Sequence, residues 1–504
     1  STSVTLATSD PNDTDPAALA LSSGQRTFSI ASTTAATGWT ITATGTDYVN
    51  PAASASYRTY DLNYGVASQA IAILPGQTHT AGKSSLATAV TGTASNQSVN
   101  VAFNTVVKIV DAHFNTITSD SSTSVSLTTA DVNDTNPTSQ NVANGVVTFS
   151  VTNFTSGVNT VTPSSSYTNN VSNNYTVVAG AATQVIAVLP GQTHNLGKSS
   201  LATAVTGTPT AYTTDNTFVV TMKAVDNWYN TDLTYSGAIS VTTDDPTDTH
   251  PGASTFASGV RAFTISPVSV LAGGIVHSSS PLATNNDSNA YNITVGAAAK
   301  LIVVLPGQTL SQGQQIIGSA VTGTPTAQVA GVAFNVTVYA TDAEFNVVNT
   351  TPSVSIATSD AYDTHPGAAS LVAGQLAFSV TNRTAGAALN MTPSAGGYTG
   401  VVSSNYVLDP STATQLLVIL PGQTYYPGQT SLANAVQTTP TAAVAGTNYA
   451  VTVRLVDAYY NTVSSAAAVS IATSDTNDTD PVAGNFTAGV ASFNANHRTA
   501  GAGN

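Results

Sequence analysis

The chain has 504 residues, of which 7% are charged and 41% hydrophobic, with a formal net charge of −14 and no cysteine. This length corresponds to about four domains of ordinary size. An acidic chain without a Lys/Arg cluster is a poor partner for nucleic acid or anionic membranes, and the lack of cysteine excludes disulfides and thiolate metal sites. Since no apolar run approaches the about 20 residues of a membrane span, we expect no transmembrane segment.

Three phrases recur along the chain with one period. Leu-Pro-Gly-Gln-Thr and Asp-x-x-x-Asn both recur in steps of 115, 116 and 115 residues. Asp-x-x-Asp-Thr-x-Pro recurs in steps of 121, 114, 115 and 115 residues. The first phrase begins at Leu74, Leu189, Leu305 and Leu420, the second at Asp10, Asp131, Asp245, Asp360 and Asp475, and the third at Asp111, Asp226, Asp342 and Asp457. Three phrases with one period predict a tandem array of equal domains.

Division of the chain before each apolar strand gives five units. Residues 1–66 form a partial domain whose opening strands are missing, and residues 414–504 form a partial domain whose closing strands are missing. The complete domains are 67–182, 183–298 and 299–413. Either the chain is part of a longer array, or its incomplete ends complement each other between subunits, because an open sandwich exposes an unpaired edge.

Within a unit, apolar and polar residues alternate as in half-buried strands. Phe334, Val336 and Val338 alternate with polar neighbours, and further strands are expected at 353–357, 374–380, 389–393 and 405–408. Residues 415–420 are almost continuously apolar, which predicts a first strand that changes sheets or lies in a domain junction. The sequence therefore predicts an all-β fold of tandem immunoglobulin-like β-sandwich domains in an elongated rod. We expect three phenylalanines to be buried at equivalent positions: Phe149, Phe263 and Phe378.

Several segments of each unit follow a known pattern. A strand runs into Asp342-x-x-x-Asn346, Ser-Ile-Ala-Thr-Ser precedes Asp360, and Gly374-x-x-x-Phe378-Ser-Val follows. In these segments the chain resembles the filamin-like and invasin-like immunoglobulin repeats of bacterial surface proteins. The resemblance implies a secreted prokaryotic stalk, adhesin or surface-layer component, located outside the cell or on its surface. The chain departs from the family pattern before the proline of the second phrase, where it has Asp15, Asn136, His250, His365 and Asp480.

The Asp-x-x-Asp-Thr-x-Pro loops are the candidate metal sites. They place two or three carboxylates within six residues, and Ca²⁺ takes oxygen ligands of this kind. The alternative is an Asx-turn, in which the aspartate accepts a backbone N–H two residues further on. Calcium is thus the one cofactor that we consider, with these candidate ligands: Asp10, Asp13, Asp15, Asp131, Asp134, Asp245, Asp248, Asp360, Asp363, Asp475, Asp478 and Asp480.

The Asp-x-x-x-Asn phrase is interpreted as a structural turn at a strand end, since Asp accepts backbone N–H groups and Asn tolerates left-handed geometry. Aromatic pairs lie inside it, namely Trp228-Tyr229 and Tyr459-Tyr460. Such rings could contact a glycan or a neighbouring domain, and we favour packing at the domain junction.

No unit has its own set of nucleophile, acid and base, and Glu344 is the only glutamate. We therefore predict that the chain is not an enzyme but a structural component of an extracellular fibre, sheath, stalk or surface layer. Its expected partners are further copies of itself, and Thr/Ser-rich loops make glycans possible. The alternatives are an adhesin for a host or neighbouring-cell ligand and a non-catalytic spacer of a larger secreted protein.

Overall fold

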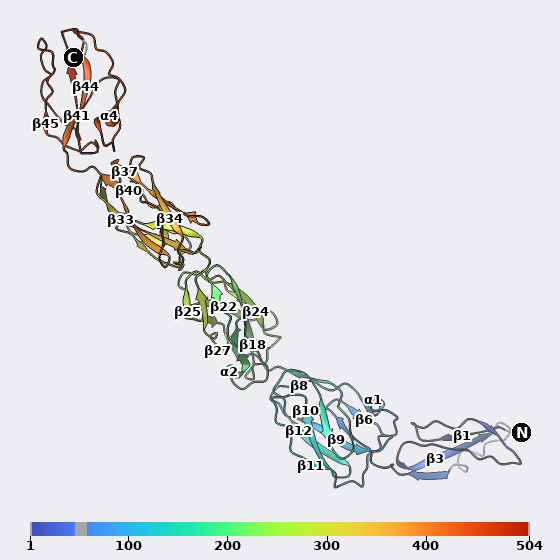
Figure 1. The fold of residues 1–504 in the computed structure, drawn as a ribbon. Helices are drawn as coiled ribbons and strands as arrows, with labels where there is room; N and C mark the ends of the chain where they lie inside the picture. Colours follow the sequence, from blue (N-terminus) through green and yellow to red (C-terminus); the bar gives the residue numbers. More distant parts are fainter. Residues whose placement is uncertain (1–2, 46–57, 502–504) are drawn as a thin grey trace.

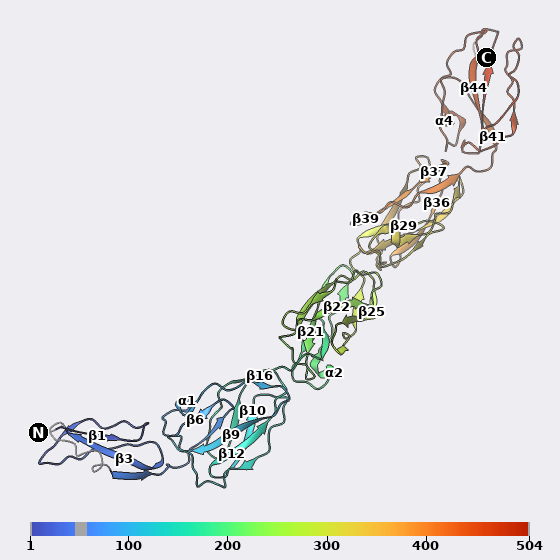
Figure 2. The ribbon, with the colours of Figure 1, turned by 180° about the vertical axis from the view of Figure 1, so that it is seen from behind.

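Five β-rich units follow one another in a gently bent line, with the chain ends at opposite ends of the molecule (Figure 1). The view from behind shows the same end-to-end order (Figure 2). This computed structural model describes residues 3–45 and 58–501. Its helices are single turns of four residues each: α1 (Leu86–Ala89), α2 (Leu201–Ala204), α3 (Ile317–Ala320) and α4 (Leu432–Ala435). The fold is therefore all-β, as predicted.

Unit 183–298 illustrates the sandwich. One face is the four-stranded sheet β24-β21-β17-β27, and the other is formed by the sheets β23-β22-β26 and β20-β28-β25. The strands are β17 (Gln184–Val188), β18 (Thr193–His194), β19 (Val205–Thr206), β20 (Tyr212–Thr213), β21 (Phe218–Val225), β22 (Ala238–Thr243), β23 (Ser254–Thr255), β24 (Val260–Ile265), β25 (Leu271–Gly274), β26 (Val276–Ser279), β27 (Thr284–Asn285) and β28 (Tyr291–Thr294). Most pairs are antiparallel, but β27 and β20 close their sheets in parallel with β17 and β28.

The two neighbouring units repeat this arrangement. Unit 67–182 contains β5 (Gln69–Ile73), β6 (Thr78–His79), β7 (Val90–Thr91), β8 (Gln97–Ser98), β9 (Phe103–Val110), β10 (Ser124–Thr129), β11 (Gln140–Asn141), β12 (Val146–Val151), β13 (Gly157–Asn159), β14 (Val161–Ser164), β15 (Thr168–Asn169) and β16 (Tyr175–Val178). Unit 299–413 contains β29 (Lys300–Val304), β30 (Thr309–Leu310), β31 (Val321–Thr322), β32 (Gln328–Val329), β33 (Phe334–Thr341), β34 (Ser353–Thr358), β35 (Ala369–Ser370), β36 (Gln375–Val380), β37 (Gly386–Leu389), β38 (Met391–Ser394), β39 (Thr399–Gly400) and β40 (Tyr406–Asp409).

The core of each of these units lies between its sheets. In unit 183–298 it combines Val220 and Phe263 from the four-stranded sheet with Val241 and Ile293 from the facing sheets. Alternate strand residues point to one face, so period-2 sequences fill the space between two sheets. The three phenylalanines named from the sequence are buried as predicted, at 0%, 4% and 4% exposure for Phe149, Phe263 and Phe378.

One of the two alternatives predicted for the continuously apolar first strand, that it changes sheets, is wrong. Strand β17 stays within one sheet, between β21 and β27. Val185 and Ala187 face the main core, whereas Ile186 lies on the other face in a second cluster with Ala204 at the end of α2 and with Tyr229. The strand is apolar on both faces because the short helix covers its outer side, not because it changes sheets.

The predicted strand at 389–393 is two strands. Leu389 ends β37, which pairs with β40, and Met391 begins β38, which pairs with β34. Between them, the Asn390 N–H donates to Ser359 Oγ at 3.0 Å, and the Ser359 N–H donates to the Asn390 carbonyl at 3.0 Å. The chain therefore passes from one sheet to the other at Asn390.

The two end units contain part of the pattern. In unit 1–66, the described residues 3–45 and 58–66 form one sheet, β2-β1-β3-β4, from β1 (Ser3–Thr8), β2 (Leu19–Ala20), β3 (Ala36–Gly45) and β4 (Arg58–Leu62). Unit 414–504 is built around the sheet β41-β44-β47 and contains β41 (Gln415–Ile419), β42 (Thr424–Tyr425), β43 (Val436–Gln437), β44 (Tyr449–Val456), β45 (Ala468–Val469), β46 (Gly484–Asn485) and β47 (Val490–Ala495).

Two units contain a half-buried histidine beside a lysine. The imidazole Nε2 of His79 lies 2.9 Å from the Phe114 carbonyl and its Nδ1 lies 3.2 Å from Lys108 Nζ; His194 and Lys223 repeat this contact. Burial, together with the lysine charge, lowers the pKa of both histidines to about 4. In unit 299–413 the equivalent positions are Leu310 and Tyr339.

This contact predicts an acid-sensitive range of stability. Between pH 6.5 and about 4 the unfolded chain binds protons that the folded His79 does not, so the free energy of unfolding falls as the pH falls through this range. The substitutions His79→Leu and Lys108→Tyr, which copy unit 299–413, should flatten this dependence for unit 67–182. Calorimetric melting at pH 7.5, 6 and 4.5 measures it; an unchanged pH slope in the double variant would contradict the assignment.

Candidate functional site

The Asp-x-x-x-Asn turns lie where successive units meet. We call these contacts the first to fourth joints, in chain order, and the turns (residues 111–115, 226–230, 342–346 and 457–461) the clamp turns. In the second joint, Asp226 Oδ1 accepts the N–H groups of Trp228 at 2.8 Å and Asn230 at 2.9 Å. The turn places Tyr229 at a φ of 59°. The sequence prediction of a structural turn is confirmed, but the turn also has a second role.

The clamp asparagine binds the backbone of the preceding unit. Asn230 Nδ2 donates to the Phe154 carbonyl at 2.8 Å, and its Oδ1 accepts the Ser156 N–H at 2.8 Å. One side-chain amide thus satisfies a donor and an acceptor of the same loop, which we call the receiver loop (33–35, 154–156, 268–270 and 383–385 in the four joints). Asn230 is completely buried by this contact.

All four joints share the asparagine-to-carbonyl bond. The equivalent distances are 2.9 Å for Asn115 to Thr33, 2.9 Å for Asn346 to Val268 and 2.7 Å for Asn461 to Arg383. The clamp aspartate also accepts an N–H from the linker that enters its unit, at 2.7 Å from Gly65, 2.9 Å from Gly180, 3.2 Å from Gly296 and 2.9 Å from Ser411. The same side chains therefore build each joint from the same backbone groups.

The first aspartate of each Asp-x-x-Asp-Thr-x-Pro loop shapes the receiver loop. Asp131 Oδ2 accepts the N–H groups of Phe154 at 2.7 Å and Thr155 at 2.8 Å, and its Oδ1 accepts the Asn133 N–H at 3.0 Å. The same pattern holds at Asp10, Asp245, Asp360 and Asp475. The Asx-turn interpretation is confirmed by these bonds. Two repeated motifs, one from each unit, thus meet at one loop.

Burial and hydrogen bonding oppose each other at these carboxylates. Burial by itself raises the pKa of Asp245, but the N–H groups of Ser269, Val268 and Thr247 outweigh it and hold the pKa below its usual value. The second aspartate has fewer donors. Burial raises the pKa of Asp134, although the Thr129 hydroxyl donates to it at 2.5 Å.

Calcium binding by these loops stays a prediction. The first aspartates accept N–H groups, and the second aspartates accept a threonine hydroxyl in every copy. Asp15 and Asp480 accept the N–H groups of Thr8 and Thr473, whereas His250 and His365 pair with Asp248 and Asp363. Among residues 3–45 and 58–501, no group of three or more His, Asp or Glu side chains is arranged to hold a metal ion.

A glycine and a lysine complete the first two joints. Gly197 has a φ of +71°, and a Cβ there would lie 2.2 Å from Thr155 Oγ1 of the preceding unit. The next residue, Lys198, donates to Asn133 Oδ1 at 2.7 Å, while Asn133 Nδ2 donates to the Leu196 carbonyl at 3.1 Å. Gly82 and Lys83 occupy the equivalent places in the first joint.

The two aromatic residues of a clamp turn pack against different units: the first contacts the preceding unit, and the second packs in its own unit. Trp228 faces the preceding unit, where its ring centroid lies 4.1 Å from that of Phe154, and Tyr459 lies 5.9 Å from the Arg383 guanidinium. Tyr229 instead packs inside its own unit. The first ring of each pair therefore packs across the joint, as predicted from the sequence.

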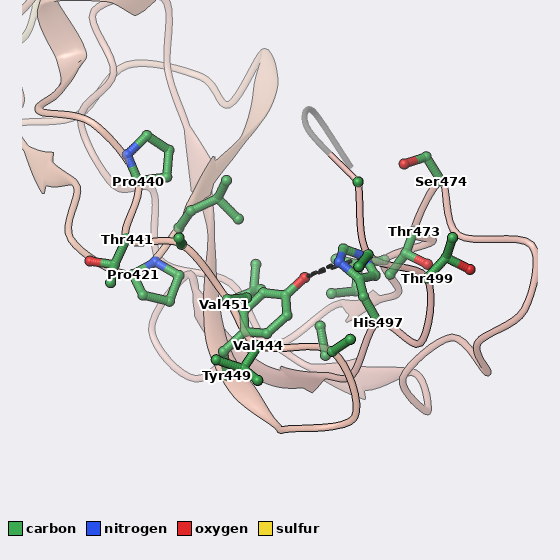
Figure 3. A pocket seen from close by; sticks show the side chains of 18 of the residues that line it. Pro421, Pro440, Thr441, Val444, Tyr449, Val451, Thr473, Ser474, His497 and Thr499 are labelled. Carbon is green, nitrogen blue, oxygen red and sulfur yellow. Dashed lines mark hydrogen bonds between the residues drawn. The ribbon is translucent and has the colours of Figure 1, made fainter.

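A cavity in unit 414–504 is shown in close-up in Figure 3. It has a volume of about 880 Å³ and is lined by Val418, Val451 and Tyr449, whose hydroxyl lies 2.9 Å from His497 Nδ1. Val418 is 48% exposed, but its equivalent in unit 299–413, Val303, is 3% exposed. In that unit β37 to β40 follow β36, and the described part of unit 414–504 ends soon after β47, the equivalent of β36. The cavity exposes part of the core of unit 414–504, and Tyr449, His497 and several threonines supply polar atoms to its lining.

The chain matches no family model, and no curated protein matches it. Among solved structures it is similar to the Escherichia coli adhesin FdeC, with 15% identity over 63% of this chain and 94% of that chain and a TM-score of 0.27. The D0–D1 domain of intimin shares 10% identity over 40% of this chain and 93% of that chain, with a TM-score of 0.17. A trypsin-activated alpha-2-macroglobulin from Escherichia coli shares 10% identity over 99% of this chain and 35% of that chain, with a TM-score of 0.22. Likeness at this level carries no argument about function.

Within residues 3–45 and 58–501, none of the helices has the length and apolar character to cross a membrane.

Removal of the clamp side chain should loosen one joint. Asn230→Ala deletes the bonds to Phe154 and Ser156, each worth about 0.5–1.5 kcal/mol. We expect faster hydrogen exchange of the Ser156 amide and a smaller radius of gyration in small-angle scattering. Asn227→Ala is the control, because Asn227 lies in the same turn but bonds Thr183 of its own unit. Equal rates of hydrogen exchange of the Ser156 amide in the two variants would contradict the role of Asn230 as a clamp.

Close approach at Gly197 gives a second test. Gly197→Ala should open the second joint, because the added methyl group collides with Thr155. Gly397→Ala serves as the control, since Gly397 has a φ of +84° and no atom lies within 4 Å of the place that an added methyl group would take. It therefore carries the same backbone strain of roughly 1–2 kcal/mol without a collision. Exchange of the Ser156 amide should rise in the first variant alone.

Proposed function

We propose that the chain is a rod-like structural segment of an extracellular or cell-surface protein, in which repeated β-sandwiches hold a fixed distance between the parts they connect. The observation that carries the proposal is the joint, built four times from equivalent residues. Covalently linked domains with small polar contacts move relative to one another by default. Buried side-chain bonds to the backbone at every joint oppose that motion.

The proposal includes no catalytic role. The features of the loops recur from unit to unit, whereas an active site needs a set of groups that converge in one place. The buried carboxylates of the joints are already bound by N–H groups, so they are committed to structure.

Further copies of the same chain are the proposed partners, in a fibre, sheath, stalk or surface layer. The supporting observation is the low charge of the surface, since 7% charged residues give weak repulsion between neighbouring rods. Sedimentation of the chain over a range of concentrations tests this part separately.

Deletion of one full period tests the rod. Removal of residues 183–298 places Asn346 next to the receiver loop at 154–156, which Asn230 binds in the intact chain. We expect electron micrographs to show rods shortened by one unit and equally straight. Removal of residues 183–240, about half a period, is the control and should give a kinked or aggregated chain. Compact particles, or free bending at all joints of the intact chain, would contradict the proposal.

A further inference from the structure

The third joint differs from the fourth in one pair of facing positions. In the fourth joint, Gly331 lies beneath the ring of Tyr459, so closely that a Cβ on Gly331 would lie 2.1 Å from Cε2 of the ring. One period earlier, the equivalent residues are Asp215 and Glu344. Two carboxylates therefore occupy the places of a glycine and an aromatic ring.

Both carboxylates line a cavity of about 260 Å³ between the two units. Asp215 comes from unit 183–298 and is held by the Thr213 hydroxyl at 2.5 Å and the Asn216 amide at 3.0 Å. Glu344 comes from the clamp turn of unit 299–413, and its Oε2 is buried without a hydrogen-bond partner in the described part of the chain. The joint thus contains one carboxylate held by donors and a second carboxylate whose Oε2 lacks one.

Other charges near Glu344 do not neutralise it. Asp342 of the same turn is completely buried and accepts the Thr214 hydroxyl at 2.6 Å. The nearby cation is Lys300, whose Nζ donates to the Ala343 carbonyl and lies 3.9 Å from the centroid of the Phe345 ring. Burial, followed by the charge of Asp342, raises the pKa of Glu344; Lys300 opposes this increase only in part, and Asp215 adds to it.

The asparagine clamp of the third joint makes one bond fewer than the clamps of the other three joints. The Asn346 amide binds the Val268 carbonyl, but among the described residues no bond joins Asn346 Oδ1 to the Val270 N–H, the equivalent of the Ser156 bond in the second joint. His250, on the aspartate loop next to this joint, pairs with Asp248 at 3.2 Å. Repulsion between carboxylates therefore acts on the joint with the weaker clamp.

We propose that the third joint is a pH-sensitive hinge of the rod, loosened at neutral pH by the facing carboxylates of Asp215 and Glu344 and stiffened in mild acid when they share a proton. A protonated Glu344 becomes a donor and can bind the Asp215 carboxylate across the cavity. This inference rests on the rod proposed above.

Distances between spin labels can test the hinge, since the chain has no cysteine to interfere. Thr264→Cys and Ser379→Cys place labels on exposed, equivalent positions on either side of the third joint. Ser379→Cys and Asn494→Cys do the same for the fourth joint. Double electron–electron resonance at several pH values between 8 and 4 then gives the distance distribution across each of the two joints. We expect the distance distribution of the first pair to be broad at pH 8 and to narrow in acid, whereas the second pair stays narrow throughout.

Two variants separate Glu344 from other titrating groups such as His250. The first variant is Glu344→Gln. The second combines Asp215→Gly with Glu344→Tyr and so copies the fourth joint. In both variants we expect the distance distribution across the third joint to be narrow at every pH. A third-joint distribution that does not change with pH, or a change that persists in Glu344→Gln, would overturn the hinge. Broad distributions at the fourth joint would instead contradict the rod itself, so the two failures are distinguishable.

Discussion

A buried carboxylate without a counter-ion is the constraint on which the joints depend. Asp226 is 4% exposed, and such a charge is tolerated only when hydrogen bonds replace its hydration. Its own turn supplies the N–H groups of Trp228 and Asn230, and the linker from the preceding unit supplies that of Gly180. Because one of these donors comes from outside the unit, the turn reaches its full hydrogen bonding only when the preceding unit is in place. Folding of the turn and docking of the neighbour are therefore coupled.

The receiver loop at the opposite end of each unit is also held by hydrogen bonds to an aspartate. Asp131 holds the N–H groups of Phe154 and Thr155 on one oxygen, which fixes the loop that Asn230 then binds. Each complete unit thus has a clamp turn at one end and a receiver loop at the other. Since preorganised partners lose little conformational entropy on contact, a small interface between units can still define their orientation.

The sequence predicted the sandwiches because their cores depend on alternation and period, which are local patterns. Phe263 and the strands around it follow directly from them. Aromatic packing at the joint was predicted, but its hydrogen bonds were missed. The two motifs that make these bonds belong to different units, and each could be explained alone, as a turn or as a calcium loop. One signal was available: both motifs keep the same period, and Gly197 follows the Leu-Pro-Gly-Gln-Thr phrase at a constant spacing. The outward apolar side of β17 also escaped prediction, because the four-residue helix that covers it has no helical periodicity of its own.

The clamps join a neutral amide to backbone groups. The ion pairs within the described residues all involve histidine. Dissolved ions screen exposed charges over about 8–10 Å at ordinary salt but have little effect on buried hydrogen bonds. The stiffness set by Asn115, Asn230 and Asn461 should therefore be the same in fresh water and in brine.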